Sequence, residues 1–246
     1  PDIRWQDTTS EIKDRSSGGN DGDTIDIDMT AATMGKLGQA LDFDGADGRV
    51  EFSPDSAINS IFTNGGTLSA WIKPAGWGEV GLGRIVDKAN VTSVTRGYSL
   101  FLNDTNPSCN DRTVIFIQGY SGTSGIWCTP EDSVSLNDWQ LVTLVYDNSS
   151  LTNDPIIYID GLSVQVTEQQ TPSGSLEDDS FETMNIGNIG TTRTFDGAID
   201  DVRLYDRALS ASEVAQLYRM GGGVTMTPCG AKTVTDADGN EYGTVQ

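Results

Sequence analysis

Asp200 is the first residue of this chain whose chemistry needs an explanation. It lies in the segment Ala198–Tyr205, whose alternating apolar and polar residues predict a β-strand. In a regular strand, Asp200 points to the same side as Val202 and Leu204. A carboxylate on an apolar face is costly unless hydrogen-bond donors or a cation meet it. We therefore expect Asp200 to have one of these two kinds of partner.

Asp44 and Asp201 offer the same kind of oxygen ligand. Asp44 follows the predicted strand Ala40–Phe43 and precedes a glycine. Hard cations such as calcium bind several oxygens, from carboxylates and from backbone carbonyls that glycine-containing turns expose. A metal site that includes these aspartates is one interpretation. In the other, Asp200 only accepts backbone N–H groups, and Asp201 pairs with Arg203 or another surface cation.

Aromatic residues in loops predict a second kind of site, because a flat ring stacks on a sugar while neighbouring polar groups hold its hydroxyls. Trp77, between two glycines, and Trp127, beside a cysteine, are the candidates, followed by Tyr120. The alternative for both tryptophans is that their loops pack against the edge of the fold. Trp71 and Trp139 lie in apolar strand segments, so we expect them in the core.

The composition excludes several classes of protein. The 246 residues include 15 basic and 36 acidic side chains, and the formal net charge of -21 repels nucleic acids and anionic membranes. Because there is no histidine, Ser-His-Asp and Cys-His catalysis and histidine-ligated zinc are excluded. The longest apolar runs, such as Leu141–Tyr146, are far shorter than the roughly 20 residues that span a bilayer. We expect neither nucleic-acid binding nor membrane insertion.

Two of the three cysteines flank a predicted β-hairpin. Its strands are 112–120 and 125–129, and Cys109 and Cys128 stand near their ends. Since hairpin ends lie close together, and since an extracellular location permits oxidation, we expect a Cys109–Cys128 disulfide. Cys229 is left over and could pair outside this chain.

These side chains must be positioned by a fold made of strands. Strand-like segments recur between clusters of Gly, Asn, Asp and Ser, a spacing typical of a sandwich rather than of alternating β and α units. Asp160-Gly161 is a strong signal for a two-residue hairpin turn. One helix is predicted, over Ala211–Arg219, and Ser210 and Glu213 have the spacing of a capping box at its start.

Several short motifs also occur along the chain in a fixed order. They are the polar loop 14–22, Gly35–Gly45, Thr67–Pro74, Trp139–Asp147, Ile157–Gly161, Ile186-Gly187, and Gly197–Tyr205 with the helix after it. Together they resemble the LamG-like domains (concanavalin A-like, laminin G and pentraxin) of bacterial secreted and surface proteins, over roughly residues 5 to 220. The resemblance implies an all-β fold, a two-sheet antiparallel jelly-roll sandwich with a short C-terminal helix.

The same resemblance implies a structural calcium that ties the N-terminal strand to the C-terminal one. The positions that match its ligands are Asp44, Asp200 and Asp201. Asp14 and Asn20, in the polar loop near the N-terminus, are weaker additions to this set.

The composition changes at the glycines 221–223. We expect the jelly-roll domain to cover residues 1–222, and 223–246 to be a linker or tail, or the start of a further module. The segment Val234–Gln246 resembles the opening of the Fibrobacter succinogenes major paralogous domain, a bacterial surface module. A hairpin in a linker would have a similar sequence.

One hexapeptide raises the possibility of an enzyme. Glu177 to Glu182 fits the Glu-x-Asp-x-x-Glu pattern of retaining glucanases built on the same jelly-roll fold. In such enzymes two carboxylates about 5 to 5.5 Å apart act as nucleophile and general acid, and both lie on one face of a strand. This segment lacks apolar alternation and has acidic neighbours, so we expect a solvated acidic loop.

The sequence therefore predicts a non-catalytic module, secreted or at the cell surface, that binds a glycan or another surface macromolecule. One alternative is a structural or assembly domain of a surface filament or multidomain envelope protein, whose partners are neighbouring subunits. A second alternative is a polysaccharide hydrolase or lyase that uses Glu177 and Glu182.

Overall fold

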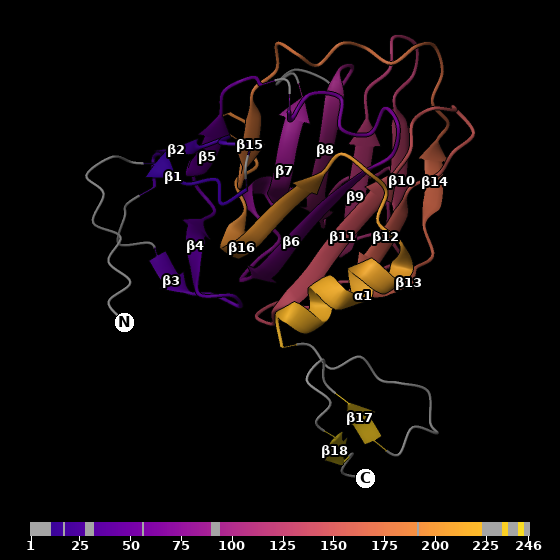
Figure 1. Ribbon diagram of the computed structural model, residues 1–246. Helices are drawn as coiled ribbons and strands as arrows, with labels where there is room; N and C mark the ends of the chain where they lie inside the picture. Colours follow the sequence, from indigo (N-terminus) through magenta and orange to yellow (C-terminus); the bar gives the residue numbers. More distant parts are fainter. Residues whose placement is uncertain are drawn as a thin grey trace.

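The computed structural model describes residues 11–16, 18–27, 32–55, 57–89, 94–190 and 192–222, and two short strands at 233–235 and 241–243. In this part of the chain, two antiparallel β-sheets face each other, and one helix lies against the outside of one sheet (Figure 1). The predicted all-β, two-sheet jelly-roll sandwich with a short C-terminal helix is confirmed.

One sheet has nine strands. In spatial order they are β1 (Glu11–Ile12), β2 (Gly22–Ile25), β5 (Arg49–Phe52), β15 (Met184–Ile186), β7 (Arg84–Ala89), β8 (Gly97–Asn103), β9 (Thr113–Gln118), β10 (Gly125–Cys128) and β14 (Thr167–Gln170). The loop between β6 and β7 contains a short 3-10 helix, η2 (Glu79–Gly81).

The other sheet has seven strands. In spatial order they are β13 (Leu162–Val164), β12 (Ile156–Ile159), β11 (Gln140–Tyr146), β6 (Gly66–Pro74), β16 (Asp196–Tyr205), β4 (Gln39–Asp44) and β3 (Ala32–Met34). A separate pair, β17 (Thr233–Thr235) and β18 (Glu241–Gly243), forms a hairpin near the C-terminus. Cys229 and most of the tail lie outside the described residues, so the domain boundary at 222 stays a prediction.

The main core fills the space between the two sheets. On β6, Leu68, Ala70 and Ile72 point inward, and their partners on β11 include Val142 and Leu144. This follows from the two-residue period of a strand, which sends alternate side chains to opposite faces.

A second apolar layer lies on the outer face of the seven-stranded sheet. Trp71, from the opposite face of β6, is buried there beneath α1 (Ala211–Met220), and Tyr218 stacks on its ring. Val214 and Leu217 complete the contact from the helix. The predicted capping box is present, since the Ser210 side chain accepts the Glu213 N–H and the Glu213 carboxylate accepts the Ser210 N–H.

Two further local predictions are confirmed. Asp160 and Gly161, with φ of 53° and 77°, join β12 to β13 by a tight hairpin turn. The Cys109–Cys128 disulfide is present, with a Cα–Cα distance of 6.0 Å. It packs with Phe101 and Ile115 on the outer face of the nine-stranded sheet.

The prediction that Asp200 shares a face with Val202 and Leu204 is wrong. The pairing of β16 with β6 shifts by one residue between Asp200 and Arg203, and Asp201 has a φ of 48°. This is a β-bulge, and its one extra residue places every later side chain of the strand on the opposite face of the sheet. Val202 and Leu204 therefore pack toward the main core, whereas Asp200 lies opposite Trp71 on the outer face.

Candidate functional site

Asp200 is buried although it lies on the outer face of its sheet. The turn after β3 covers it, and the carboxylate accepts the backbone N–H of Leu37 at 2.7 Å. The N–H groups of Lys36 and Asp201 also point to it. Burial raises the pKa of Asp200, and the hydrogen bond from Leu37 opposes this change. A side chain at Gly35 would collide with the carboxylate, so this position needs a glycine.

The predicted calcium ligands do not converge on one point. Asp44 lies directly opposite Asp196 on β16, and Asp200 is four residues further along that strand. At roughly 3.3 Å per residue this separates Asp44 from Asp200 by about 13 Å. Calcium holds its oxygens at about 2.3 to 2.6 Å, so the two carboxylates cannot share one ion. Asp201 instead pairs with Arg203 at 2.8 Å.

Asp14 and Asn20 belong to a different part of the fold. They lie in the loop between β1 and β2, in the nine-stranded sheet. The Asp14 carboxylate accepts the N–H groups of Ser16 at 2.7 Å and of Asn20 at 2.9 Å. Burial raises the pKa of Asp14, but these bonds outweigh it and lower the pKa overall. The loop is thus closed by its own side chains.

No group of three or more Asp, Glu, Cys or His side chains in the described residues is placed to hold a metal ion. Calcium binding by this chain stays a prediction, but the set Asp44, Asp200 and Asp201 does not fit one ion. The arrangement of Asp200 matches the interpretation in which backbone N–H groups are its partners.

We expect Asp200→Ala to lower the free energy of unfolding by about 2 to 3 kcal/mol, because it leaves buried N–H groups without an acceptor. The loss should be equal in calcium and in EDTA. Urea unfolding in both buffers measures it, with Asp111→Ala, which removes an exposed carboxylate outside the predicted calcium set, as the matched control. A loss that appears only in calcium would show that Asp200 is a metal ligand.

The predicted sugar platforms Trp127 and Tyr120 are buried inside the sandwich. Trp127 stacks on Phe116, with ring centroids 5.7 Å apart, and its indole N–H donates to Asp154 at 2.8 Å. The Tyr120 hydroxyl bonds to that of Tyr146. Neither ring offers a face to a ligand, so this prediction is wrong for both residues.

Trp77 has an intermediate position. It is half-buried in the loop before η2 and packs against the main core, while its carbonyl accepts the N–H of Gly83 at 2.8 Å. This arrangement matches the alternative in which the loop packs against the edge of the fold.

The acidic hexapeptide 177–182 is a turn around the buried Lys88, not a strand. The Lys88 ammonium donates to the carbonyls of Asp179 at 2.5 Å and Glu182 at 2.9 Å, and lies 3.8 Å from the Asp179 carboxylate. That carboxylate also accepts the Ser60 N–H at 3.0 Å. We call this cluster the Lys88 hub. The solvated acidic loop predicted here is wrong for Asp179, which is buried.

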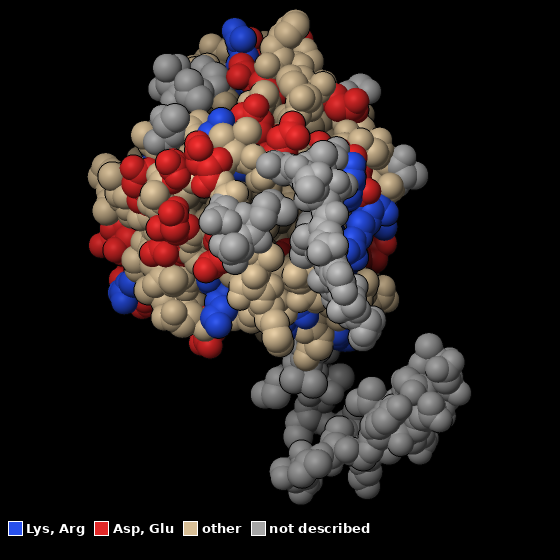
Figure 2. Space-filling model, turned by 90° about the vertical axis from the view of Figure 1, so that its left-hand side faces the viewer, with Lys and Arg blue, Asp and Glu red and all other residues tan. Residues whose placement is uncertain are grey.

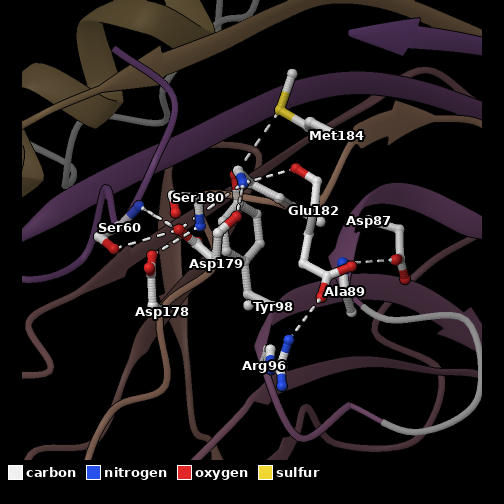
Figure 3. Close-up of polar contacts among 12 residues, drawn as sticks. Ser60, Asp87, Ala89, Arg96, Tyr98, Asp178, Asp179, Ser180, Glu182 and Met184 are labelled. Carbon is white, nitrogen blue, oxygen red and sulfur yellow. Dashed lines mark hydrogen bonds and ion pairs between the residues drawn. The ribbon is translucent and has the colours of Figure 1, made fainter. Parts of the chain in front are cut away.

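Nor does this turn form the catalytic pair of a retaining glucanase. Asp179, at the centre of the motif, is engaged with Lys88, and Glu182 faces Arg96 at 3.8 Å (Figure 3). Glu177 and Glu182 do not lie on one strand, which that mechanism requires.

A second buried ion pair lies on the outer face of the nine-stranded sheet. The Arg84 guanidinium lies 3.3 Å from the Asp87 carboxylate, which also accepts the Ser99 hydroxyl at 2.6 Å. Arg84 stacks over the Phe101 ring. Burial raises the pKa of Asp87 to about 6, although Arg84 acts against this change.

This pair should give the folding stability a pH dependence. Because the folded-state pKa of Asp87 lies above the unfolded value near 3.8, the native state holds the extra proton between these values. Stability relative to Asp87→Asn should therefore fall as pH rises from about 4 to about 6, by on the order of 2 kcal/mol. Thermal unfolding of both proteins across this range measures the difference, and a rise with pH would contradict the prediction.

Polar and aromatic groups also line a pocket of about 200 Å³ on the outer face of the seven-stranded sheet. We call it the Trp139 pocket. It is lined by Thr33, Met34, Asp42, Lys73, Ala75, Asn137, Trp139, Gly197 and Ala198. Met34 is 87% exposed, so the pocket mouth opens to solvent.

Strand register explains how these side chains meet. Ala198 on β16 lies between Asp42 on β4 and Lys73 on β6, directly opposite both. Because the Ala198 side chain is small, it forms the bottom of the pocket between the Asp42 carboxylate and the Lys73 ammonium group. Trp139 immediately precedes β11, whose first residue lies opposite Ile72, so the indole comes beside Lys73. Asn137, with a φ of 66°, donates its N–H to the Pro74 carbonyl at 2.6 Å.

The polar groups of this pocket have no partners in the part of the chain that the structure describes. Its carboxylate, ammonium, side-chain amide and indole N–H make no hydrogen bond or ion pair there (Asp42, Lys73, Asn137 and Trp139). Burial raises the pKa of Asp42, as do Asp196 and Asp44, while Lys73 lowers it. Such a set can accept and donate several hydrogen bonds around one half-buried aromatic ring.

A larger pocket of about 370 Å³ lies beside the loop after β11. Its acidic groups already have partners, because Asp154 accepts the Trp127 indole N–H and Asp147 accepts the Ser149 N–H at 2.9 Å. Its one aromatic residue, Tyr146, is buried. It offers less to a ligand than the Trp139 pocket.

This site is not among those that the sequence predicts. The apolar strand after Trp139 predicts that this residue lies in the core, whereas in the structure it is half-buried and packs against the second apolar layer. The polar pair Asn137-Asp138 before it is the available signal that this tryptophan stands at the end of a loop. No sequence pattern indicates that Asp42 and Lys73 flank the same small residue.

Comparisons with known proteins agree with this fold. A family model described as "Concanavalin A-like lectin/glucanases superfamily" matches residues 44–215. No curated protein matches the chain. Among the helices of the described residues, none is long and apolar enough to cross a membrane.

Several solved structures are similar. The binding domain of Paraclostridial Mosquitocidal Protein 1 has a TM-score of 0.61 at 17% identity, over 86% of this chain and 51% of that one. Domain 4 of AbnA, an extracellular arabinanase from Geobacillus stearothermophilus, was solved in complex with arabinotriose. It has a TM-score of 0.51 at 18% identity, over 76% of this chain and 80% of that one. The binding domain of Botulinum Neurotoxin DC in complex with SialylT has a TM-score of 0.59 at 14% identity, over 95% of this chain and 54% of that one.

The chain thus spans about half the length of the mosquitocidal and neurotoxin binding domains. At these identities the likeness shows a shared fold.

Proposed function

Since this chain belongs to the concanavalin A-like lectin/glucanases superfamily, we propose that it is a non-catalytic module that binds a carbohydrate in the Trp139 pocket. The observation that carries the proposal is the pocket itself, in which a half-buried indole meets three polar side chains that make no hydrogen bond or ion pair with the described residues. Sugar sites combine an aromatic face with a few polar groups that fix the hydroxyls.

The similar structures support a binding role. One of them is an arabinanase domain in complex with arabinotriose, and the other two are binding domains of a mosquitocidal protein and of a neurotoxin. The Lys88 hub occupies the one motif that resembled a glucanase pair, which favours binding over catalysis. The disulfide favours a secreted or cell-surface location, because such bonds persist in oxidising compartments.

Affinity electrophoresis tests this proposal. The purified chain is run through gels that contain arabinan, galactan, xylan, mannan or mixed-linkage glucan, and we expect at least one to retard it. Retardation by none of them would contradict the proposal and favour the structural or assembly alternative. Release of reducing ends or of unsaturated products from any of them would contradict the non-catalytic part.

A further inference from the structure

We infer that the Trp139 pocket selects neutral sugars and rejects sugars that carry a carboxylate or a sulfate. This inference rests on the proposed function and names the chemical class of its ligand. It follows from the charges that surround the pocket, from the lack of an arginine among the lining residues that the structure describes, and from the hydrogen bonds that the polar groups of the pocket can make.

Three carboxylates stand on the same face of the sheet at the pocket or next to it. Asp42 lines the pocket, Asp44 is two residues further along β4, and Asp196 lies directly opposite Asp44 on β16. Directly opposite side chains on antiparallel strands are about 5 Å apart, and residues two apart on one strand are about 7 Å apart. These carboxylates repel one another even without a ligand, since Asp196 and Asp44 both raise the pKa of Asp42.

One cation balances these charges in part. Lys73 lies across Ala198 from Asp42 and stabilises its ionised form. The three carboxylates and this one ammonium leave a local charge of about -2, so an anionic ligand would enter a negative field. The whole chain has a formal net charge of -21, and Figure 2 shows acidic side chains over much of the side where β1 to β5 lie.

The kind of cation matters as well as the number. Carboxylates and sulfates are held best by the planar guanidinium fork of arginine, which gives two parallel hydrogen bonds. Among the described residues that line the pocket there is no arginine. Lys73 can donate to a hydroxyl as readily as to an anion.

A neutral sugar ring would satisfy three of these groups, the carboxylate, the ammonium and the side-chain amide. Two neighbouring hydroxyls can donate to the Asp42 carboxylate, and others can accept from Lys73 and bond to the Asn137 amide. The Trp139 indole offers a face to the C–H groups of the ring. A pocket of about 200 Å³ is smaller than the roughly 300 to 1,000 Å³ of drug-sized ligand sites, so it suits a single ring.

The test compares uncharged polysaccharides with anionic ones. Affinity gels contain arabinan, galactan, xylan or mannan in one set, and polygalacturonate, alginate or hyaluronan in the other. Galactan and polygalacturonate are compared directly, because both are built from units of the galactose configuration and the second has a carboxylate at C6. Both sets are run at low salt in EDTA and again in calcium. We expect retardation by a neutral polysaccharide, and dissociation constants at least tenfold larger for every anionic one.

Equal or tighter binding of an anionic polysaccharide, in EDTA or in calcium, would overturn this inference and leave the proposed function in place. No binding to either set would overturn the proposed function itself. As a second variant, Asp44→Asn/Asp196→Asn removes two negative charges outside the pocket lining. We expect it to strengthen the interaction with polygalacturonate at least threefold at low salt, and no change would contradict the electrostatic cause.

Discussion

Replacing Trp139 by alanine is expected to weaken binding of the neutral polysaccharide at least tenfold. The indole is the aromatic face of the pocket, and covering about 60 Å² of apolar surface at about 25 cal/mol per Å² contributes about 1.5 kcal/mol. A tenfold change in the dissociation constant corresponds to about 1.4 kcal/mol, so loss of this burial reaches this value. Affinity electrophoresis or titration calorimetry with the retarding polysaccharide measures it.

Two variants separate loss of the site from loss of the fold. Phe181→Ala removes an aromatic side chain that is 79% exposed and lies outside the pocket, so binding should not change. Ala198→Leu fills the pocket floor between Asp42 and Lys73 without changing charge, and it should weaken binding as much as Trp139→Ala. Wild-type affinity in either pocket variant, with an unchanged thermal unfolding profile, would place the ligand elsewhere.

Replacing Lys88 by alanine should destabilise the fold more than Asp200→Ala does. It removes the cation that pairs with the buried Asp179 carboxylate and the donor to two carbonyls. Breaking a buried ion pair by removing one partner typically costs about 3 to 5 kcal/mol, because a charge is left buried without its counterpart. Guanidinium unfolding at neutral pH measures the loss.

A series of Lys88 variants distinguishes charge from packing. Lys88→Met keeps most of the apolar stem but not the ammonium, so it should be nearly as destabilising as Lys88→Ala. Lys88→Met/Asp179→Asn removes both charges and should recover at least about 1 kcal/mol relative to Lys88→Met. Arg15→Ala removes an exposed cation and should change stability by less than about 0.5 kcal/mol. A Lys88→Met variant as stable as the wild type would show that the hub adds nothing to folding.

Several parts of the fold could be predicted because their causes are local. The helix Ala211–Met220 starts at its capping box, and the hairpin after β12 turns at Asp160-Gly161. The strand alternation that predicted a sandwich depends on nearest neighbours in the same strand. The Cys109–Cys128 disulfide followed from the closeness of hairpin ends. In each case the signal and its structural effect lie within a short stretch of the chain.

The candidate site could not be predicted in this way. Asp42, Lys73 and Trp139 come from three different parts of the chain, and they meet only because β4, β16 and β6 pair in one register and Trp139 precedes the next strand. Trp127 and Trp139 both stand close to apolar strand residues in the sequence. The first stacks inside the sandwich, and the second lines an open pocket.

By itself, the sequence determined the class of fold, the main elements and the exclusion of histidine chemistry, because composition and two-residue alternation act locally. Only the tertiary structure decided which side chains face water. A single extra residue at Asp201 exchanges the faces of β16, so Asp200 turns away from the main core and is covered by the turn after β3. The burial of Asp179 likewise depends on a distant segment, because its partner Lys88 lies 91 positions away along the chain. Burial is a property of contacts between distant segments, and no window along the chain contains both partners.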